Sequence, residues 1–285
     1  MAVGTTEFID NVTADVFIKE VWSQEAVIAR ESKLLFAEKV NRVYEKDLNM
    51  GDKVHIPNVS NLTVATKTAN TAINYETVTE TNQTITVATH EYQAIAVETI
   101  TKKQADRDLI AIYAPKQGFA LGLSIDDVLA GLIDDFSNTV GTLGVELTYD
   151  DVLRGVQYLN DADVPQSDRC IVISPAQLAG FMKIDQFIHG DYSSLNSDAK
   201  PAVKESYIGK WMGMPVHFST NVEGTNAAGH DNGIFHKDAL ALVVQIKPTT
   251  HTFFDIDYLA DKVAIEQLHG SKEIRDDHGV WLKGA

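Results

Sequence analysis

The clearest periodic pattern in the chain is an apolar stripe within residues 101–137. Its large apolar residues recur at helical intervals, which places them on one face of a long helix near residues 116–137. Pro115 should kink or restart the helix, and three glycines lower its intrinsic propensity, so we expect its stability to come from packing. The stripe is formed by Leu121, Ile125, Val128, Leu129, Leu132, Ile133 and Phe136, and the opposite, solvated side carries Ser124, Asp126 and Asp127.

A different pattern, with period two, covers residues 51–97. Apolar and polar positions alternate in two stretches, which predicts two long strands at roughly 53–64 and 83–98. The segment between them is rich in threonine and asparagine, and has too few large apolar residues to form a core. A hairpin that cannot bury itself projects and packs on another surface. We therefore expect this hairpin to make contacts outside its own domain.

Residues 148–247 alternate between helical and strand patterns. Thr148 is a suitable N-cap for a helix, and Ser174-Pro175 opens a second one after a buried strand at Arg169–Ile173. Tyr207 to Thr220 predicts two strands around Gly213, and Ala239 to Ile246 predicts another. A polar loop of about 20 residues follows Asp185, which is long for a simple connection. This region is expected to be an α/β lobe.

The two ends of the chain complete an α+β organisation. Residues 1–50 are expected to form an extended arm with a short helix capped by Ser23. Residues 248–285 are expected to form a β-rich tail that returns to the part of the fold holding the long helix. Within this tail, the turn at residues 276–279 is predicted to join two short closing strands. With residues 98–147 around the long helix, the chain divides into five segments: 1–50, 51–97, 98–147, 148–247 and 248–285.

Composition excludes several classes of protein. Hydrophobic residues make up 44% of the 285 residues, which is ordinary for a globular protein with a core. No apolar run approaches the length of a membrane span, and no secretory signal is visible at the N-terminus. The net charge of −16 and the absence of a Lys/Arg cluster argue against sequence-specific nucleic-acid binding. One cysteine, Cys170, excludes an internal disulfide framework and fits a reducing compartment.

Residue types that carry chemistry do not converge in the sequence. Asp276, Asp277 and His278 are adjacent, so they point in different directions and are expected to form a solvated turn rather than a metal site. Cys170 lies within an apolar strand and is expected to be a buried thiol. Neither a nucleotide-binding loop nor a nucleophile elbow is present. We therefore expect no catalytic residues, no cofactor and no metal. The other candidates that are set aside are His230, Asp231, His236 and the run His189-Gly190-Asp191-Tyr192-Ser193-Ser194.

Several local phrases, in their order along the chain, resemble the major capsid proteins of tailed bacteriophages, which share the Hong-Kong-97-type fold. The resemblance covers nearly the whole chain, and its specificity comes from the ordered set. The phrases are Phe17-Ile18-Lys19-Glu20-Val21-Trp22-Ser23, Val40-Asn41-Arg42-Val43-Tyr44, Gly51-Asp52-Lys53-Val54-His55-Ile56-Pro57, Asp163-Val164-Pro165 through Arg169 to Ser174-Pro175, Gly209-Lys210-Trp211-Met212-Gly213-Met214-Pro215-Val216, and His236-Lys237-Asp238-Ala239-Leu240-Ala241.

The resemblance implies a map of the fold. Residues 1–50 would be the N-terminal arm, and residues 51–97 the extended loop that lies over a neighbouring subunit. Residues 98–147 and the return strands 248–285 would form a peripheral lobe around the spine helix. Residues 148–247 would be the axial lobe, whose loop near His189, Asp191 and Tyr192 lies near the symmetry centres. The residues of the extended loop that would contact the neighbour are Val64, Thr66, Lys67, Thr68, Ile73 and Tyr75.

The resemblance also implies a function. Such a subunit is not an enzyme; it assembles as pentamers and hexamers into an icosahedral shell around double-stranded DNA, which it contacts non-specifically. Scaffolding, portal and possibly decoration proteins would be its partners, with no membrane involved. Its location would be the virion, and the host cytoplasm during assembly. Three alternatives stay open: an encapsulin-like nanocompartment shell, an α/β enzyme with a dispersed site, and a secreted or tail-associated β protein.

Overall fold

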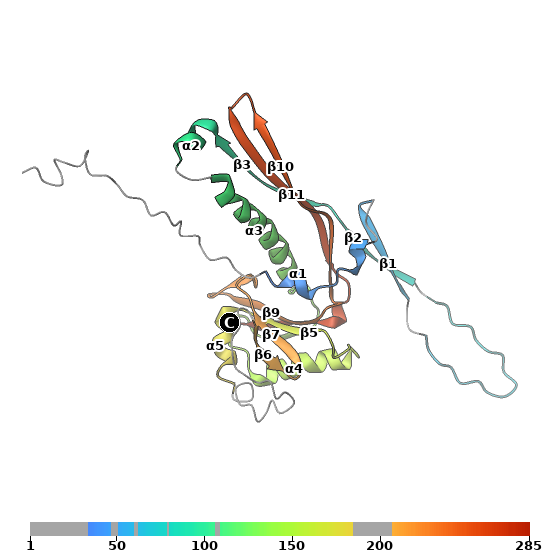
Figure 1. Cartoon of the computed structure of the whole chain (residues 1–285). Helices are drawn as coiled ribbons and strands as arrows, with labels where there is room; N and C mark the ends of the chain where they lie inside the picture. The colour runs from blue at the N-terminus through green and yellow to red at the C-terminus, as the bar shows by residue number, and fades with distance from the viewer. Residues whose placement is uncertain (1–33, 47–50, 60–61, 79, 106–108, 185–206) are drawn as a thin grey trace, which may run out of the picture. The chain divides into compact units, whose positions relative to one another are not determined.

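The structure is a computed structural model that describes residues 34–46, 51–59, 62–78, 80–105, 109–184 and 207–285 (Figure 1). The chain divides into two compact units, residues 1–31 and residues 32–285. The first unit, with the predicted helix after Ser23, lies outside the described residues. The second contains both helices and strands, with more strand than helix, so its class is α+β, as expected.

The predicted hairpin in residues 51–97 is present at its base. Strand β1 (Lys53–Val59) pairs antiparallel with β2 (Glu80–Thr86), from Lys53 opposite Thr86 to Val59 opposite Glu80. Beyond the ends of the two strands the chain forms a long loop without regular structure (Figure 1). The base of the hairpin is fastened to the body, where three buried side chains of this region join a small apolar cluster. Its buried members are Val54, Ile85, Val87, Ala241 and Val243.

One long strand over residues 83–98 was the wrong prediction, because the chain forms two strands there. Strand β2 ends at Thr86, and β3 (Thr89–Glu98) begins a different sheet. The apolar alternation continues through both strands, so the period alone does not mark the break. The pairing partners mark the break: Thr86 pairs with Lys53 of β1, whereas Thr89 pairs with His269 of β11.

The second sheet has three strands in the order β10–β11–β3, with β10 at Leu240–Asp255 and β11 at Ala260–Glu273. Residues of β3 and β11 alternate between buried and more exposed positions, so the sheet has one covered face. Helix α3 (Leu109–Ala130) packs on β3 and β11, and the short helix α2 (Thr99–Gln104) precedes it. Pro115 lies inside α3 and does not end it.

The long helix ends earlier than the sequence pattern predicts. Helix α3 stops at Ala130, and the next residues form tight turns in which Leu132 N–H donates to the Leu129 carbonyl and Ile133 N–H to that of Ala130. The apolar stripe nevertheless continues into the core, because Ile133 and Phe136 are fully buried. Asp126 was predicted on the solvated side, and this is wrong: its side chain is completely buried.

The third sheet has seven strands, with the order β4–β12–β9–β5–β7–β6 and β8 paired to β9. Thr148 caps helix α4 through a capping box with Asp151, and Ser174 caps α5, as the sequence predicts. Met212 and Gly213, both with positive φ (48° and 84°), form the two-residue turn between β6 and β7. The elements are β4 (Thr139–Gly141), α4 (Tyr149–Asp161), β5 (Arg169–Ile173), α5 (Pro175–Phe181), β6 (Tyr207–Trp211), β7 (Met214–Phe218), β8 (Gly224–Thr225), β9 (Gly229–His236) and β12 (Gly279–Gly284).

The C-terminal tail is divided between two sheets, which corrects the expectation that all of residues 248–285 return to the helix-bearing part. Strand β11 does so by pairing with β3, but β12 lies between β4 and β9 in the seven-stranded sheet. Strand β10 also runs across the expected boundary at residue 247, since register shifts between Ile246 and Thr249 accommodate Pro248 without ending the strand. The short helical segments are α1 (Phe36–Lys39), η2 (Val43–Lys46) and η3 (Asp276–His278).

Candidate assembly surface

The loop at the tip of the hairpin, residues 62–78, is exposed along its whole described length. Val64 is 100% exposed and Tyr75 is 88% exposed. The hydrogen bonds of this tip are local: Thr63 donates to the Glu76 carboxylate, and Thr71 donates to the Thr68 carbonyl. All six residues expected to contact a neighbour lie exposed on this one segment: Val64, Thr66, Lys67, Thr68, Ile73 and Tyr75.

The tip exposes more apolar surface than a short polar turn needs. Its exposed large apolar residues are Leu62, Val64, Ile73, Tyr75 and Val78. Burying a side chain of this size contributes about 1.5–3 kcal/mol. Such a cluster on one exposed segment is typical of a surface that is covered by a partner.

A second group of exposed apolar residues lies where β10 turns into β11, and the sequence analysis did not single it out. Five large apolar residues there are exposed: Phe253, Phe254, Ile256, Tyr258 and Leu259. The signal was available, because five such residues within residues 253–259 are unusual for a hairpin turn. The number of large apolar residues in this short segment, rather than their alternation with polar residues, indicates an exposed apolar group.

The face of the three-stranded sheet turned away from α3 carries paired charges. Glu266 of β11 lies between His90 of β3 and His251 of β10, with each imidazole Nε2 at 2.9 Å from one carboxylate oxygen. Hydrogen bonds from His90 and then His251 lower the pKa of Glu266. Lys262 and Asp255 form a further ion pair on this sheet. This face is therefore polar where Glu266 lies between the two histidines.

Asp126 organises the junction between α3 and the segment that enters the fold. Its carboxylate accepts backbone N–H groups from Leu35 at 3.1 Å and Phe36 at 2.7 Å, and the Asn221 side-chain amide at 2.8 Å. Gly122, one turn earlier in α3, leaves room for Leu34, since a Cβ there would lie 2.5 Å from Leu34 Cδ1. Together these contacts hold the segment that contains Leu34, Leu35 and Phe36 against α3.

Among the residues considered for chemistry, His236 and His278 are brought together, with ring centroids 5.8 Å apart. Cys170 is buried, and burial raises the pKa of its thiol to about 12, so the reactive thiolate is disfavoured. His230 contacts Asn226, and His236 accepts the N–H of Asp238. Across the described parts of the chain, no three His, Cys, Asp or Glu side chains are placed to hold a metal. His189, Asp191 and Tyr192 lie outside the described residues.

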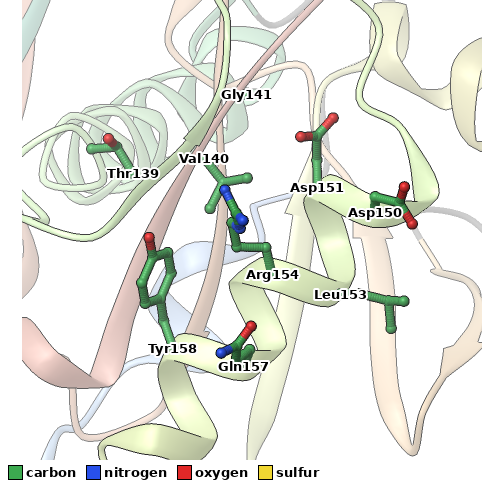
Figure 2. A pocket seen from close by; sticks show the side chains of 9 residues that line it. All are labelled: Thr139, Val140, Gly141, Asp150, Asp151, Leu153, Arg154, Gln157 and Tyr158. Carbon is green, nitrogen blue, oxygen red and sulfur yellow. The ribbon is translucent and has the colours of Figure 1, made fainter.

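A pocket of about 570 Å³ lies between strand β4 and helix α4 (Figure 2). Arg154 and Tyr158 extend from α4 along it, and Asp150 and Asp151 stand at the start of the same helix. Neither histidine, cysteine nor serine lines the pocket. Its lining consists of Thr139, Val140, Gly141, Asp150, Asp151, Leu153, Arg154, Gln157 and Tyr158.

Comparison with solved structures identifies the fold. No protein-family model and no curated protein sequence matches the chain. A chain from a structure of Mycobacterium phage Che8 superposes with a TM-score of 0.81 at 24% identity, covering 94% of this chain and 97% of that one. The capsid structure of the Cyanophage P-SCSP1u gives 0.75 at 16% identity, covering 96% and 94%. The fold is that of a phage capsid protein.

Capsid-fold similarity extends to other phages and covers whole chains. The asymmetric unit of the bacteriophage PhiM1 mature capsid matches with a TM-score of 0.72 at 14% identity, over 93% of this chain and 91% of that one. Coverage is nearly complete in both directions, so the likeness includes the hairpin, the helix-bearing sheet and the seven-stranded sheet together. In addition, no helix among the described residues is long and apolar enough to cross a membrane.

Proposed function

We propose that this chain is the structural subunit of a tailed-phage capsid, and that it assembles as pentamers and hexamers into an icosahedral shell around double-stranded DNA. The observation that carries the proposal is the capsid fold, matched over 94% of this chain by the Che8 structure. The exposed hairpin tip adds support, because soluble monomers rarely leave this many large apolar side chains exposed on one segment.

In this proposal the hairpin of residues 51–97 reaches onto a neighbouring subunit. Val64, Ile73 and Tyr75 supply apolar contacts, while Thr66, Lys67 and Thr68 supply hydrogen bonds or charge. The α/β region 148–247 meets its copies at the fivefold and sixfold centres, through a loop that includes His189, Asp191 and Tyr192. Each contact can be weak, because many contacts made at once add as avidity.

The net charge of −16 fits a shell that encloses DNA without gripping it, since an acidic surface repels phosphates. Scaffolding and portal proteins, and possibly decoration proteins, are the partners of this proposal, with the virion as the site of action and the host cytoplasm as the site of assembly. The subunit performs no catalysis in this role.

The hairpin tip offers a direct test. Val64→Ser with Tyr75→Ser removes two apolar side chains that are 100% and 88% exposed. We expect unfolding by urea to be unchanged within about 0.5 kcal/mol, because the changes are on the surface. Sedimentation velocity should show particles for the parent protein and dispersed subunits for the variant.

The matched control is Val64→Ile with Tyr75→Phe, which keeps the apolar surface and should keep assembly. Loss of assembly in this control as well would mean that the tip acts through something other than apolar burial. Particles formed equally by the serine variant would contradict the assigned role of the tip. Particles that contain protein cargo in place of DNA would favour the alternative of an encapsulin-like nanocompartment shell.

A further inference from the structure

Strand β10 is an outer strand of the three-stranded sheet, so one of its two backbone edges faces away from β11. The first part of this edge is used by the chain itself, because Asn41 forms a parallel bridge with Ala241. The Asn41 N–H donates to the Leu240 carbonyl, and the Asn41 carbonyl accepts the Leu242 N–H, each at 3.0 Å. The edge of β10 is therefore able to accept an added segment, and it does so in the parallel direction.

The second half of the edge, Thr249 to Asp255, is open to solvent. Residues 249–254 are all exposed, and this half of β10 lies in the long hairpin that β10 forms with β11 (Figure 1). The pairing with β11 keeps a regular register from Thr249 to Asp255. In such a strand, alternate backbone N–H and C=O groups point away from the paired neighbour and can bond to a further strand.

This open half lacks the features with which proteins usually protect a sheet edge, which are lysine, proline and bulges. Lys247, Pro248 and the register shifts of β10 all lie before Thr249. The run that follows, Thr249-Thr250-His251-Thr252-Phe253-Phe254, consists mostly of β-branched and aromatic residues, which favour strands. An exposed edge of this composition is a template for another strand.

A segment that suits this edge lies in the hairpin tip, at residues 62–68. Its sequence, Leu62-Thr63-Val64-Ala65-Thr66-Lys67-Thr68, is also rich in β-branched residues, and every one of them is exposed. Within the described parts of the chain, hydrogen bonds reach the ends of the segment, at Thr63 and Thr68, but not the backbone between them. Segment 62–68 therefore has the composition of a strand without a strand partner in the described part of its own chain.

Charge favours one direction for the pairing. Lys67 is the only charged residue of segment 62–68. At the far end of the open edge, Asp255 pairs with Lys262, and Asp257 adds an exposed carboxylate, whereas Lys247 lies before the near end. A segment parallel to β10 places Lys67 beside the aspartates, and an antiparallel segment places it nearer to Lys247.

We propose that segment 62–68 of one copy adds to the open half of β10 of a neighbouring copy as a parallel strand. With Lys67 opposite Asp255, Val64 lies opposite Thr252 and diagonal to Phe254, so backbone hydrogen bonds and apolar contacts form together. The inference rests on the proposed function, because it needs a second copy of the chain. It names the surface of the neighbour on which the hairpin of residues 51–97 lies.

Cysteine cross-linking between two copies tests the contact. Cys170 is buried, and burial raises its thiol pKa to about 12, so introduced cysteines are the reactive ones. Val64→Cys and Thr252→Cys proteins are mixed, concentrated with a crowding agent and oxidised, and the joined peptides are identified by mass. We expect about tenfold more mixed disulfide than with Val64→Cys and Thr142→Cys, because the bond needs Cα atoms within about 7 Å. Thr142 is an exposed threonine outside the proposed contact.

A charge reversal tests the parallel direction. Adding Lys67→Glu to the Val64→Cys protein should lower the yield of mixed disulfide about threefold, which is the size of effect expected for an exposed ion pair. Adding Asp257→Lys to the Thr252→Cys protein should then restore the yield. Both residues are exposed, so neither change should alter the fold. A yield that Asp257→Lys does not restore would contradict the parallel placement.

The mixed disulfide is measured in assembled particles and in dispersed subunits. A yield equal to that of the Thr142→Cys control in both fractions would overturn the proposal. A stronger disulfide between two Thr252→Cys chains would also overturn it, because two β10 edges would then pair with each other. Particles that lack the mixed disulfide would leave the capsid function standing without this contact. The mixed disulfide in dispersed subunits that never form particles would support the contact and count against a shell.

Discussion

Asp126 shows how one residue can decide where two distant segments meet. Its side chain is 0% exposed and lies on a helix whose buried residues are mostly apolar. Among the described residues, the carboxylate is satisfied by the backbone N–H groups of Leu35, Phe36 and Ala37 together with the Asn221 amide. A buried carboxylate is tolerated only with such a set of donors, because its desolvation is costly.

Replacing Asp126 with asparagine should therefore destabilise the protein. The amide keeps the shape but brings two donors of its own toward N–H groups, which leaves buried donors without acceptors. We expect the free energy of unfolding to fall by about 2–3 kcal/mol, measured by urea denaturation of the dispersed subunit.

Asp127→Asn is the matched control, since Asp127 is the neighbouring residue and is exposed. Partial desolvation of its carboxyl group, and then the charge of Asp126, raises the pKa of Asp127, so its neutralisation should not cost stability. An Asp126→Asn protein as stable as Asp127→Asn would mean that the buried carboxylate is not an anchor.

The role of Asp126 could not be read from the sequence. Beside Asp127 it looks like part of a solvated helix face, and its donors are backbone groups about 90 positions away that carry no side-chain signal. Cys170 was the opposite case, because a cysteine inside the run Arg169–Ile173 already indicated burial, and the structure confirms it. Local context predicts burial well when the neighbours are uniformly apolar, and poorly when the partners are distant.

At the scale of elements, local capping was the most predictable feature. Thr148 was expected to begin a helix, and it does so with its hydroxyl accepting the Asp151 N–H and the Asp151 carboxylate accepting the Thr148 N–H. These bonds involve residues three apart, so the sequence holds all the information needed.

Thr148→Ala should reduce the free energy of unfolding by about 1 kcal/mol, because the Asp151 N–H at the start of α4 loses its acceptor. Thermal and urea unfolding of the subunit would measure the change. Thr142→Ala, at an exposed threonine with no capping role, should stay within about 0.5 kcal/mol of the parent. Equal effects at both positions would show that the capping box adds nothing.

Strand partners were the least predictable feature at this scale. Apolar and polar residues do alternate over residues 83–98, as the prediction of one strand assumed. These residues nevertheless belong to two strands, β2 and β3, which lie in two different sheets. The same applies to the tail, where β11 and β12 follow each other in sequence and still join different sheets. Pairing depends on contacts between residues far apart in the chain, which a period in one segment does not reveal.

For the whole molecule, the ordered phrases along the sequence indicated a capsid fold, and the match to solved phage structures bears out that fold. Composition alone would not have done so, because an acidic, ordinary globular composition fits many folds. The six tip residues proposed for inter-subunit contact, and the loop with His189, Asp191 and Tyr192, remain predictions about an assembly.

The central claim, that this chain builds a shell, is tested most directly by negative-stain electron microscopy of the protein expressed alone, concentrated with a crowding agent. Closed shells, tubes or hexameric rings are the predicted result. If the subunits stay dispersed, the same measurement is repeated after co-expression with the scaffolding protein of the same phage. Dispersed subunits under both conditions, with a hairpin tip that already resists protease in the free chain, would contradict the account.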